Sequence, residues 1–270
     1  MELTKTHESL RRGKTGLTAF IDRWIYVVMA AMLIVIVLIG FVPDSFEKLA
    51  DVSSGKRPPL PLALHVHAVL MGAWLLLVLT QTTLMATGRS QWHMQLGLIG
   101  LVLAPAMVAA GFVLVPVNVA SKLEFSLAAS PEVRALLERS VRTSFNISLG
   151  QIRVGACFAV LVGLAIAMRK RDPDLHKRLM ILATITPMGA AFSRIPGLPS
   201  TMPESPLSQM LWPLAAAIPM FAWDLYRLRA VHRAYWWFAA VMLPTGVLVA
   251  LLWDTPLWLD LAARLILAAP

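Results

Sequence analysis

The sequence predicts an all-α, polytopic membrane protein: a bundle of about seven transmembrane helices with its N-terminus in the cytoplasm. Three observations predict it. Of the 270 residues, 58% are hydrophobic and only 14% are charged, whereas soluble domains carry about 25% charged residues. Apolar segments of about 20 residues, the length that a helix needs to cross a bilayer, recur along the chain. Basic residues gather in alternate connections between these segments.

Seven segments are predicted as spans and together form a transmembrane domain over residues 24–255. They cover residues 24–42, 60–86, 93–117, 149–168, 176–195, 207–226 and 234–253. The fifth is the least apolar, and the sixth contains Pro213 and Pro219, which can bend a helix. The polar, basic residues 1–23 are predicted as a cytoplasmic tail, since the apolar run that follows is longer than that of a usual cleaved signal peptide.

Two segments outside the spans are predicted to be helical. The outward-facing connection 118–146 contains Ser130-Pro131-Glu132, a typical helix start. It is amphipathic and is interpreted either as a lid on the outer surface or as a segment that only fills space. The C-terminal residues 256–270 are too few to cross a membrane. They are predicted as an interfacial helix, with apolar residues set against two charged ones. The apolar residues are Trp258, Leu259, Leu261, Leu265 and Leu267, and the charged ones are Asp260 and Arg264.

Charge distribution sets the orientation and excludes one class of partner. The formal net charge is +9, which by itself would suit a nucleic-acid-binding protein. However, 14 basic and six acidic residues fall on the side of the N-terminus, against ten and nine elsewhere. This is the positive-inside pattern of membrane proteins, so no nucleic-acid partner is predicted and the lipid bilayer is. Eight of the nine tryptophans lie near predicted span ends, as in interfacial belts.

Segment 60–86 carries a polar and aromatic stripe. His67, Trp74 and Gln81 are spaced by seven residues, which places them on one side of a helix. Because lipid is a poor environment for polar groups, we expect this stripe to face the bundle. It is either part of a ligand cavity or a hydrogen-bonded seam that only holds helices together.

His65 and His67 form a His-x-His pair near the outer end of the same segment. On a regular helix their imidazoles point about 200° apart and cannot share one ligand. Pro59 and Pro61 lie just upstream, so an irregular first turn would let the two rings converge. Neutral imidazole suits Zn, Cu or Fe, and the pair is therefore a candidate metal site, with structural polar contacts as the alternative.

Arginines and further histidines define two more candidate regions. Arg153 and Arg194 are predicted toward the outside, where with the outer histidines they would line a cavity for an anion or a quinone-like head group. The alternative is that both arginines extend to the interface. His93 and His176 each precede a helix that starts from the inside. They are either interfacial residues or converging ligands for one haem or transition metal.

Several chemistries lack support in the sequence. The single cysteine, Cys157, excludes an internal disulfide. We find no phosphate-binding Walker loop, no His-Glu-x-x-His and no Gly-x-Ser-x-Gly, so no enzymatic reaction is assigned. The predicted spans are interpreted as lacking a buried acid, which argues against a carboxylate proton relay.

Two stretches resemble a known family. The first is Leu64-His65-Val66-His67-Ala68 with Trp74, Gln81, Gly88-Arg89 and His93, and the second is Leu175-His176-Lys177-Arg178-Leu179-Met180. Over roughly residues 60–195 they resemble bacterial multi-helix inner-membrane proteins of no assigned function. The resemblance implies a multi-pass protein of the bacterial inner membrane. There is a looser similarity to b-type membrane cytochromes.

Three functions are consistent with these observations. The chain is a non-catalytic subunit or assembly factor, with a membrane protein partner or a second copy of itself. Alternatively, it is a redox protein that binds haem or metal through His65, His67, His93 and His176. The third hypothesis is a small-ligand permease or sensor with a cavity at Trp74, Gln81, Arg153 and Arg194.

Overall fold

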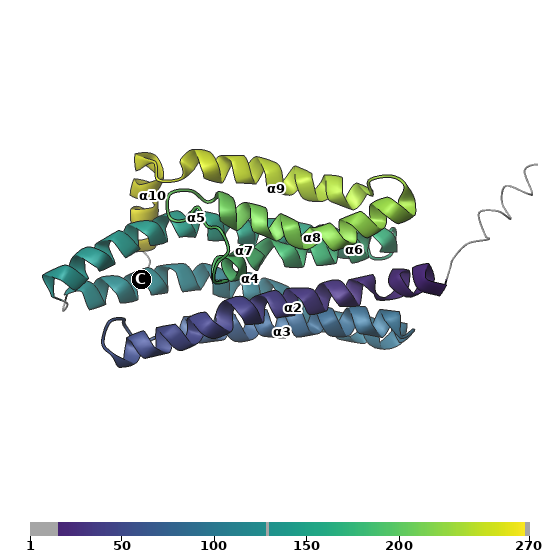
Figure 1. Cartoon of the computed structure of the whole chain (residues 1–270), viewed down its shortest axis with the longest axis horizontal. Coiled ribbons are helices and arrows are strands. Elements are labelled where there is room, and N and C mark those ends of the chain that lie inside the picture. The colour runs from purple at the N-terminus through teal and green to yellow at the C-terminus, as the bar shows by residue number, and fades with distance from the viewer. Residues whose placement is uncertain (1–15, 128–129, 268–270) are drawn as a thin grey trace, which may run out of the picture.

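The computed structural model describes residues 16–127 and 130–267, and every regular element within them is helical. In chain order these elements are α2 (Gly16–Ser53), α3 (Leu62–Ala86), α4 (Ser90–Leu127), α5 (Pro131–Met168), α6 (Pro173–Ile185), η1 (Thr186–Met188), α7 (Gly189–Phe192), α8 (Leu207–Leu228), α9 (Arg233–Leu252) and α10 (Pro256–Leu267). The longer helices run side by side along one axis (Figure 1). The predicted all-α class is confirmed.

Among the described residues, five helices are long and apolar enough to cross a membrane: α2, α3, α4, α5 from Arg134 onward, and α9. They coincide with five of the seven predicted spans. The bundle has two ends, which we name by what they contain. The N-side end is where α2, α4, α6 and α9 begin, and the hairpin end is where α4 turns back into α5 (Figure 1). The predicted tail 1–23 lies outside the described residues up to residue 15, and residues 16–23 form the first turns of α2.

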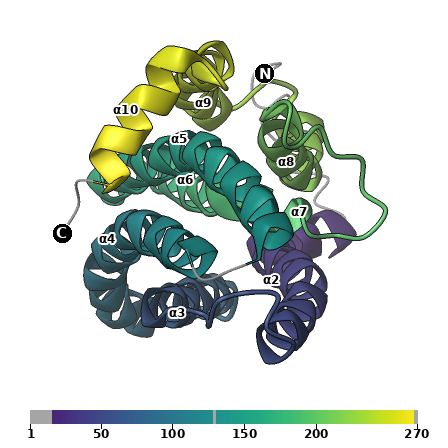
Figure 2. The same cartoon turned by 90° about the vertical axis from the view of Figure 1, so that its left-hand side faces the viewer.

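The segment predicted as the fifth span is broken rather than continuous. Helix α6 has 13 residues, about 20 Å in length, and the 3₁₀ turn η1, which contains Pro187, separates it from the short α7. Ile181, Leu182 and Ile185 are fully buried, and α6 contacts α2, α5, α8 and α9. Protein therefore surrounds this segment, which explains how it tolerates a broken backbone and a lower apolar content. Figure 2 shows α5 and α6 in the middle of the bundle.

The polar stripe of α3 faces the bundle, in an antiparallel seam with α4. The His67 Cε1 atom lies 3.4 Å from the position that a Cβ atom would take on Gly111, and the Gln81 Nε2 atom lies 3.6 Å from the equivalent position on Gly97. Both pairs follow one register, in which a large side chain packs on a glycine. Small residues of this kind let membrane helices approach closely.

Trp74, in the middle of the stripe, is a core residue. Its side chain is 1% exposed, its Nε1–H donates to Thr184 Oγ1 at 3.2 Å, and its ring meets the Phe158 ring edge-on at 5.1 Å between centroids. The indole therefore joins α3 to α5 and α6. The hydrogen bond satisfies both polar groups in an apolar interior.

The segment 118–146 is not a separate loop, because most of it forms the turns of α4 and α5 at the hairpin end. Each helix has 38 residues, about 57 Å, against an apolar bilayer core of about 30 Å. Lys122 Nζ donates to Ser144 Oγ at 2.7 Å and to Ser140 Oγ at 3.1 Å, which ties the two helices together. In Figure 1 this hairpin extends beyond the rest of the bundle.

The C-terminal segment forms α10, which lies across the hairpin end of the bundle (Figure 2). Trp258 is 5% exposed and packs with Leu149, Val249 and Trp253. Its Nε1–H donates to the Phe145 carbonyl at 2.9 Å. The indole therefore anchors α10 on α5.

The turn before α10 depends on one carboxylate. Asp254 accepts hydrogen bonds from Arg142 Nε at 3.1 Å, Arg142 Nη2 at 3.2 Å and Asn146 Nδ2 at 3.0 Å. These bonds lower the pKa of Asp254 below its ordinary 3.8, and the bond from Arg142 has a larger effect than the bond from Asn146. The contact thereby links α5 to the α9–α10 turn.

We expect the docking of α10 to weaken in acid. A carboxyl group whose pKa is lower in the folded state stabilises the fold above its unfolded pKa, and this contribution is lost as the pH falls through the folded pKa. Here the loss occurs below about pH 4. The tryptophan fluorescence change that acid titration causes in the wild type but not in Trp258→Phe measures it. Asp254→Asn should remove this transition, and an identical titration of the variant would contradict the assignment.

Candidate functional site

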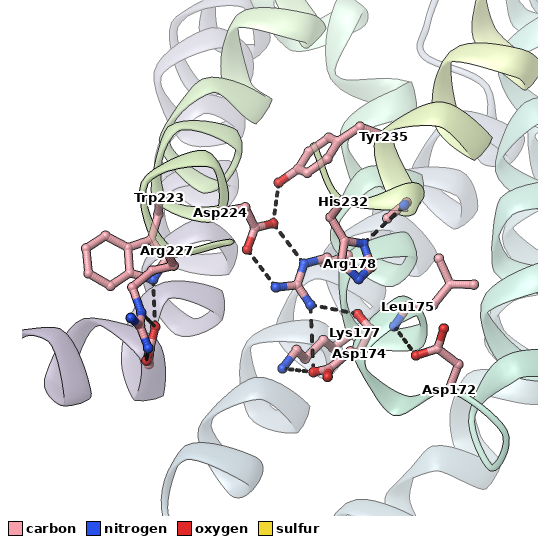
Figure 3. Close-up of polar contacts among 12 residues, drawn as sticks. Asp172, Asp174, Leu175, Lys177, Arg178, Trp223, Asp224, Arg227, His232 and Tyr235 are labelled. Carbon is pink, nitrogen blue, oxygen red and sulfur yellow. Dashed lines mark hydrogen bonds and ion pairs between the residues drawn. The ribbon is translucent and has the colours of Figure 1, made fainter. Parts of the chain in front are cut away.

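A buried ion pair joins α6 to α8 near the N-side end (Figure 3). Arg178 donates from Nε to Asp224 Oδ2 at 2.8 Å and from Nη2 to Asp224 Oδ1 at 2.6 Å. The two side chains are 8% and 5% exposed. Tyr235 of α9 donates its hydroxyl to Asp224 Oδ2 at 2.7 Å. One carboxylate therefore fixes α6, α8 and α9 relative to one another through three charge-assisted hydrogen bonds.

Hydrogen bonds and ion pairs also fix the first turns of α6. Asp172 caps the helix by accepting the Leu175 N–H at 3.1 Å and is paired with Arg233. Arg178 Nη1 also donates to the Asp174 carbonyl at 3.0 Å, and Lys177 forms an ion pair with the Asp174 carboxylate at 2.5 Å (Figure 3). These contacts fix the position and rotation of the first turns of α6.

His232 caps α9 beside this network. Its Nδ1 atom accepts the Ala234 N–H at 3.1 Å, which requires a lone pair on that nitrogen. Burial, followed by the positive charge of Arg178, lowers the pKa of His232. Both effects favour the neutral ring that the cap needs.

The Arg178–Asp224 pair corrects one inference from the sequence. The spans were expected to contain no buried acid, and Asp224 was one of the six acids counted on the side of the N-terminus. Asp224 instead lies within α8 and is buried. The sequence gives no sign that Asp224 is buried in an ion pair, because its partner Arg178 lies 46 residues away.

The two inner histidines come from different helices and lie within electrostatic range of each other. His176, in the first turns of α6, contacts the Ala165 carbonyl of α5 through Nδ1 at 2.8 Å. His93 of α4 is near enough for its charge to act on His176. A carbonyl oxygen only accepts, so His176 Nδ1 carries the proton and the Nε2 lone pair is left free. Metal-binding histidines are commonly oriented by this type of bond.

Two buried polar atoms adjoin this pair without a hydrogen-bond partner among the described residues: His93 Nδ1 and Gln81 Oε1. Gln81 reaches the region from α3, where it packs on Gly97. An unpaired polar atom inside a protein costs about 1–3 kcal/mol. The region formed by His93, His176 and Gln81, which we call the inner histidine site, is therefore equipped to bind a polar or metallic ligand.

The outer histidines are arranged differently. Helix α3 is regular from Leu62 onward, so the irregular first turn that would let the two rings converge is not present. His65 is exposed, whereas His67 is half-buried against Gly111, with an unpaired Nδ1 atom. Across the described ranges, no three His, Cys, Asp or Glu side chains are grouped as a metal site.

The two predicted cavity arginines have separate partners. Arg153 donates to the Met242 carbonyl at 3.0 Å and to Thr245 Oγ1 at 3.2 Å, both on α9. Arg194 instead pairs with Asp44 of α2 at 3.1 Å. The structure therefore does not bring them together in a shared cavity. Trp74 and Gln81 likewise belong to interhelical contacts.

Fold and polar geometry together define a helical protein with membrane-length spans and a histidine pair near one end. No family model matches the chain, and comparisons with curated proteins and with solved structures also give no match. Its function must therefore be inferred from the geometry of its own side chains.

Proposed function

We propose that the chain is a seven-span protein of the bacterial inner membrane, with its N-side end in the cytoplasm. The five membrane-length helices are joined in this proposal by α8 and by the α6–η1–α7 segment. Basic residues are concentrated in the connections at the N-side end, as the positive-inside rule requires. The resemblance of the Leu64–Ala68 and Leu175–Met180 stretches to bacterial inner-membrane proteins supports the same location.

At the inner histidine site, His93 and His176 bind a transition-metal ion, either alone or as haem iron. The observation that carries this proposal is the hydrogen bond from His176 Nδ1 to the Ala165 carbonyl, because it leaves Nε2 as a ligand atom beside a histidine of another helix. Neutral imidazole nitrogen suits Zn, Cu and Fe. When iron or copper is bound, the metal would supply electron-transfer chemistry.

The surrounding residues explain how the protein positions such ligands. The Arg178–Asp224 pair and the Asp172 cap fix the rotation of α6, and with it the direction of His176. The unpaired oxygen of Gln81 would be available to accept a hydrogen bond at this site. These residues act as positioning residues, since none of them needs to bind the metal directly.

Elemental analysis and an absorption spectrum of the detergent-purified protein test this function. We expect near-stoichiometric metal, with a Soret band if the metal is haem iron. His176→Ala and His93→Ala should each lose at least about 90% of it, because a two-histidine site keeps only one ligand. His65→Ala is the matched control and should retain full occupancy.

Two results would contradict the proposal. One is an apoprotein that takes up neither haem nor Zn, Cu or Fe when these are supplied. The other is equal metal loss in the His65, His93 and His176 variants, which would indicate non-specific binding to surface imidazoles.

A second candidate function is that of a subunit or assembly factor, and the α4–α5 hairpin favours it. The hairpin projects beyond the bundle, and Leu127 and Leu136 near its turn are 77% and 65% exposed. Exposed leucines outside the membrane suit a partner protein or a second copy of this chain. Cross-linking in native membranes tests it: a product from a cysteine at residue 136 but not at residue 139 is expected. Absence of any cross-linked product from residue 136 in native membranes would contradict it.

A further inference from the structure

Four cations from four different segments meet near the hairpin end, far from the inner histidine site. They are Lys48 of α2, Arg57 of the α2–α3 connection, Lys122 of α4, and Arg194 directly after α7. Lys48 lies within electrostatic range of Arg57 and Arg194, and Lys122 lies within range of Arg57 and Lys48. We call this group the hairpin-end basic cluster.

A single carboxylate is paired inside this cluster. Asp44 accepts from Arg194 Nε at 3.1 Å and pairs with Lys48 one helical turn away. Asp44 and Lys48 are each 22% exposed, and Arg194 is 29% exposed. The Arg194 guanidinium also lies 4.6 Å from the centre of the Phe41 ring. Among the described residues, Asp44 is the only acid that forms an ion pair with any of the four cations, and it serves two of them in a partly desolvated region.

The other two cations have no carboxylate partner within the described part of the chain. Lys122 Nζ is held by the hydroxyls of Ser140 and Ser144, which use two of its three N–H groups as donors. The charges that act on Lys122 are those of Arg57 and Lys48, both positive. Arg57 is half-buried and makes no hydrogen bond or ion pair with the described residues. Their donors are therefore available to a ligand.

Like charges that lie within electrostatic range of one another repel more strongly where water is partly excluded. A multivalent anion would relieve this repulsion and accept the free donors of Lys122 and Arg57. We propose that the hairpin-end basic cluster binds a phosphate group, whose tetrahedral oxygens match several cationic donors at once. This inference does not depend on the inner histidine site, which lies at the other end of the bundle.

The phosphate has two chemical sources. The cluster lies where α2 ends and α3 begins, and Phe46 and Leu49 beside it are 69% and 54% exposed. An anionic phospholipid would place its head group on the cations and its acyl chains along this apolar face. A soluble phosphate compound would bind the same donors without the apolar contact.

Two probes distinguish these sources in the purified full-length protein. The first is inorganic phosphate, read out as the shift in thermal unfolding temperature against chloride at equal ionic strength. The second is phosphatidylglycerol against phosphatidylcholine, read out as retained lipid in native mass spectrometry. Retention of phosphatidylglycerol alone assigns a lipid head group, and stabilisation by phosphate assigns a soluble ligand.

Lys122→Gln and Arg57→Gln are the test variants, and Arg139→Gln on the exposed side of the same hairpin is the control. Each test variant should bind the effective probe about tenfold more weakly or worse, since each loses a charged hydrogen bond, whereas Arg139→Gln should bind as the wild type does. Without anion, Arg57→Gln should unfold at the same or a higher temperature, because repulsion is relieved. Failure of both probes to bind, or equal weakening in all three variants, would overturn the proposal.

Discussion

Replacing Asp224 with alanine is expected to lower the free energy of unfolding by about 3–5 kcal/mol, since it leaves a buried cation without its partner. Arg178 is only 8% exposed, so its guanidinium cannot turn into water without disrupting α6. The Tyr235 hydroxyl loses its acceptor at the same time. The effect should therefore exceed that of any surface charge in the bundle.

Thermal unfolding in detergent measures this difference against a matched acid. Asp174→Ala removes a carboxylate that also contacts Arg178 but is 68% exposed, and such exposed pairs contribute only about 0–1 kcal/mol. The double variant Arg178→Met/Asp224→Leu should recover much of the loss, because it removes both charges. Equal unfolding temperatures for Asp224→Ala and Asp174→Ala would show that the pair is not buried in the protein.

The sequence is most informative where a helix must meet lipid. Residues 24–42, 93–117 and 149–168 lie within helices of membrane length, and 60–86 and 234–253 match α3 and α9 to within two residues at each end. The reason is that lipid-facing residues must be apolar along a whole span. The periodic stripe of α3 was likewise predicted to face the bundle. Its seven-residue spacing is a local property that a helix preserves, so His67 and Gln81 both meet α4.

The sequence is less informative about segments that are enclosed by other helices of the bundle. Segment 176–195 has a lower apolar content, which gives no sign that it is the most enclosed segment and is broken at residues 186–188. Hydropathy also cannot show how far α4 and α5 continue beyond the bilayer. Their outer turns are amphipathic because each packs on the other, and the segment 118–146 therefore resembled a surface loop.

At the candidate sites, the structure differs from the sequence-based prediction mostly in pairings between distant residues. His93 and His176 were predicted at the same end because each precedes a helix that starts there, and their positions agree with that rule. Asp224 with Arg178 and Asp44 with Arg194 follow no spacing rule, since they depend on which helices are neighbours. The metal-site prediction for His65 and His67 stays a prediction, with the two rings on different sides of a regular helix.

Gly40→Ala and Gly189→Ala should each lower the free energy of unfolding by about 1–3 kcal/mol or more, which is typical of overpacking that forces the backbone to move. A Cβ atom on Gly40 would overlap the Ala191 carbonyl oxygen of α7, and one on Gly189 would overlap the Gln209 carbonyl oxygen of α8. Both obstacles are backbone atoms. No change of side-chain rotamer can relieve them, so α7 must move away from α2 or from α8.

Gly72→Ala in α3 is the matched control, because nothing lies within 4 Å of its Cβ position; it should stay within about 1 kcal/mol of the wild type. Thermal unfolding of the three variants in one detergent compares them directly. Because α7 continues the broken segment that begins with α6, displacement of α7 should also disturb the position of His176 and reduce metal occupancy. Wild-type stability in Gly40→Ala and Gly189→Ala would contradict the close backbone packing on which this coupling depends.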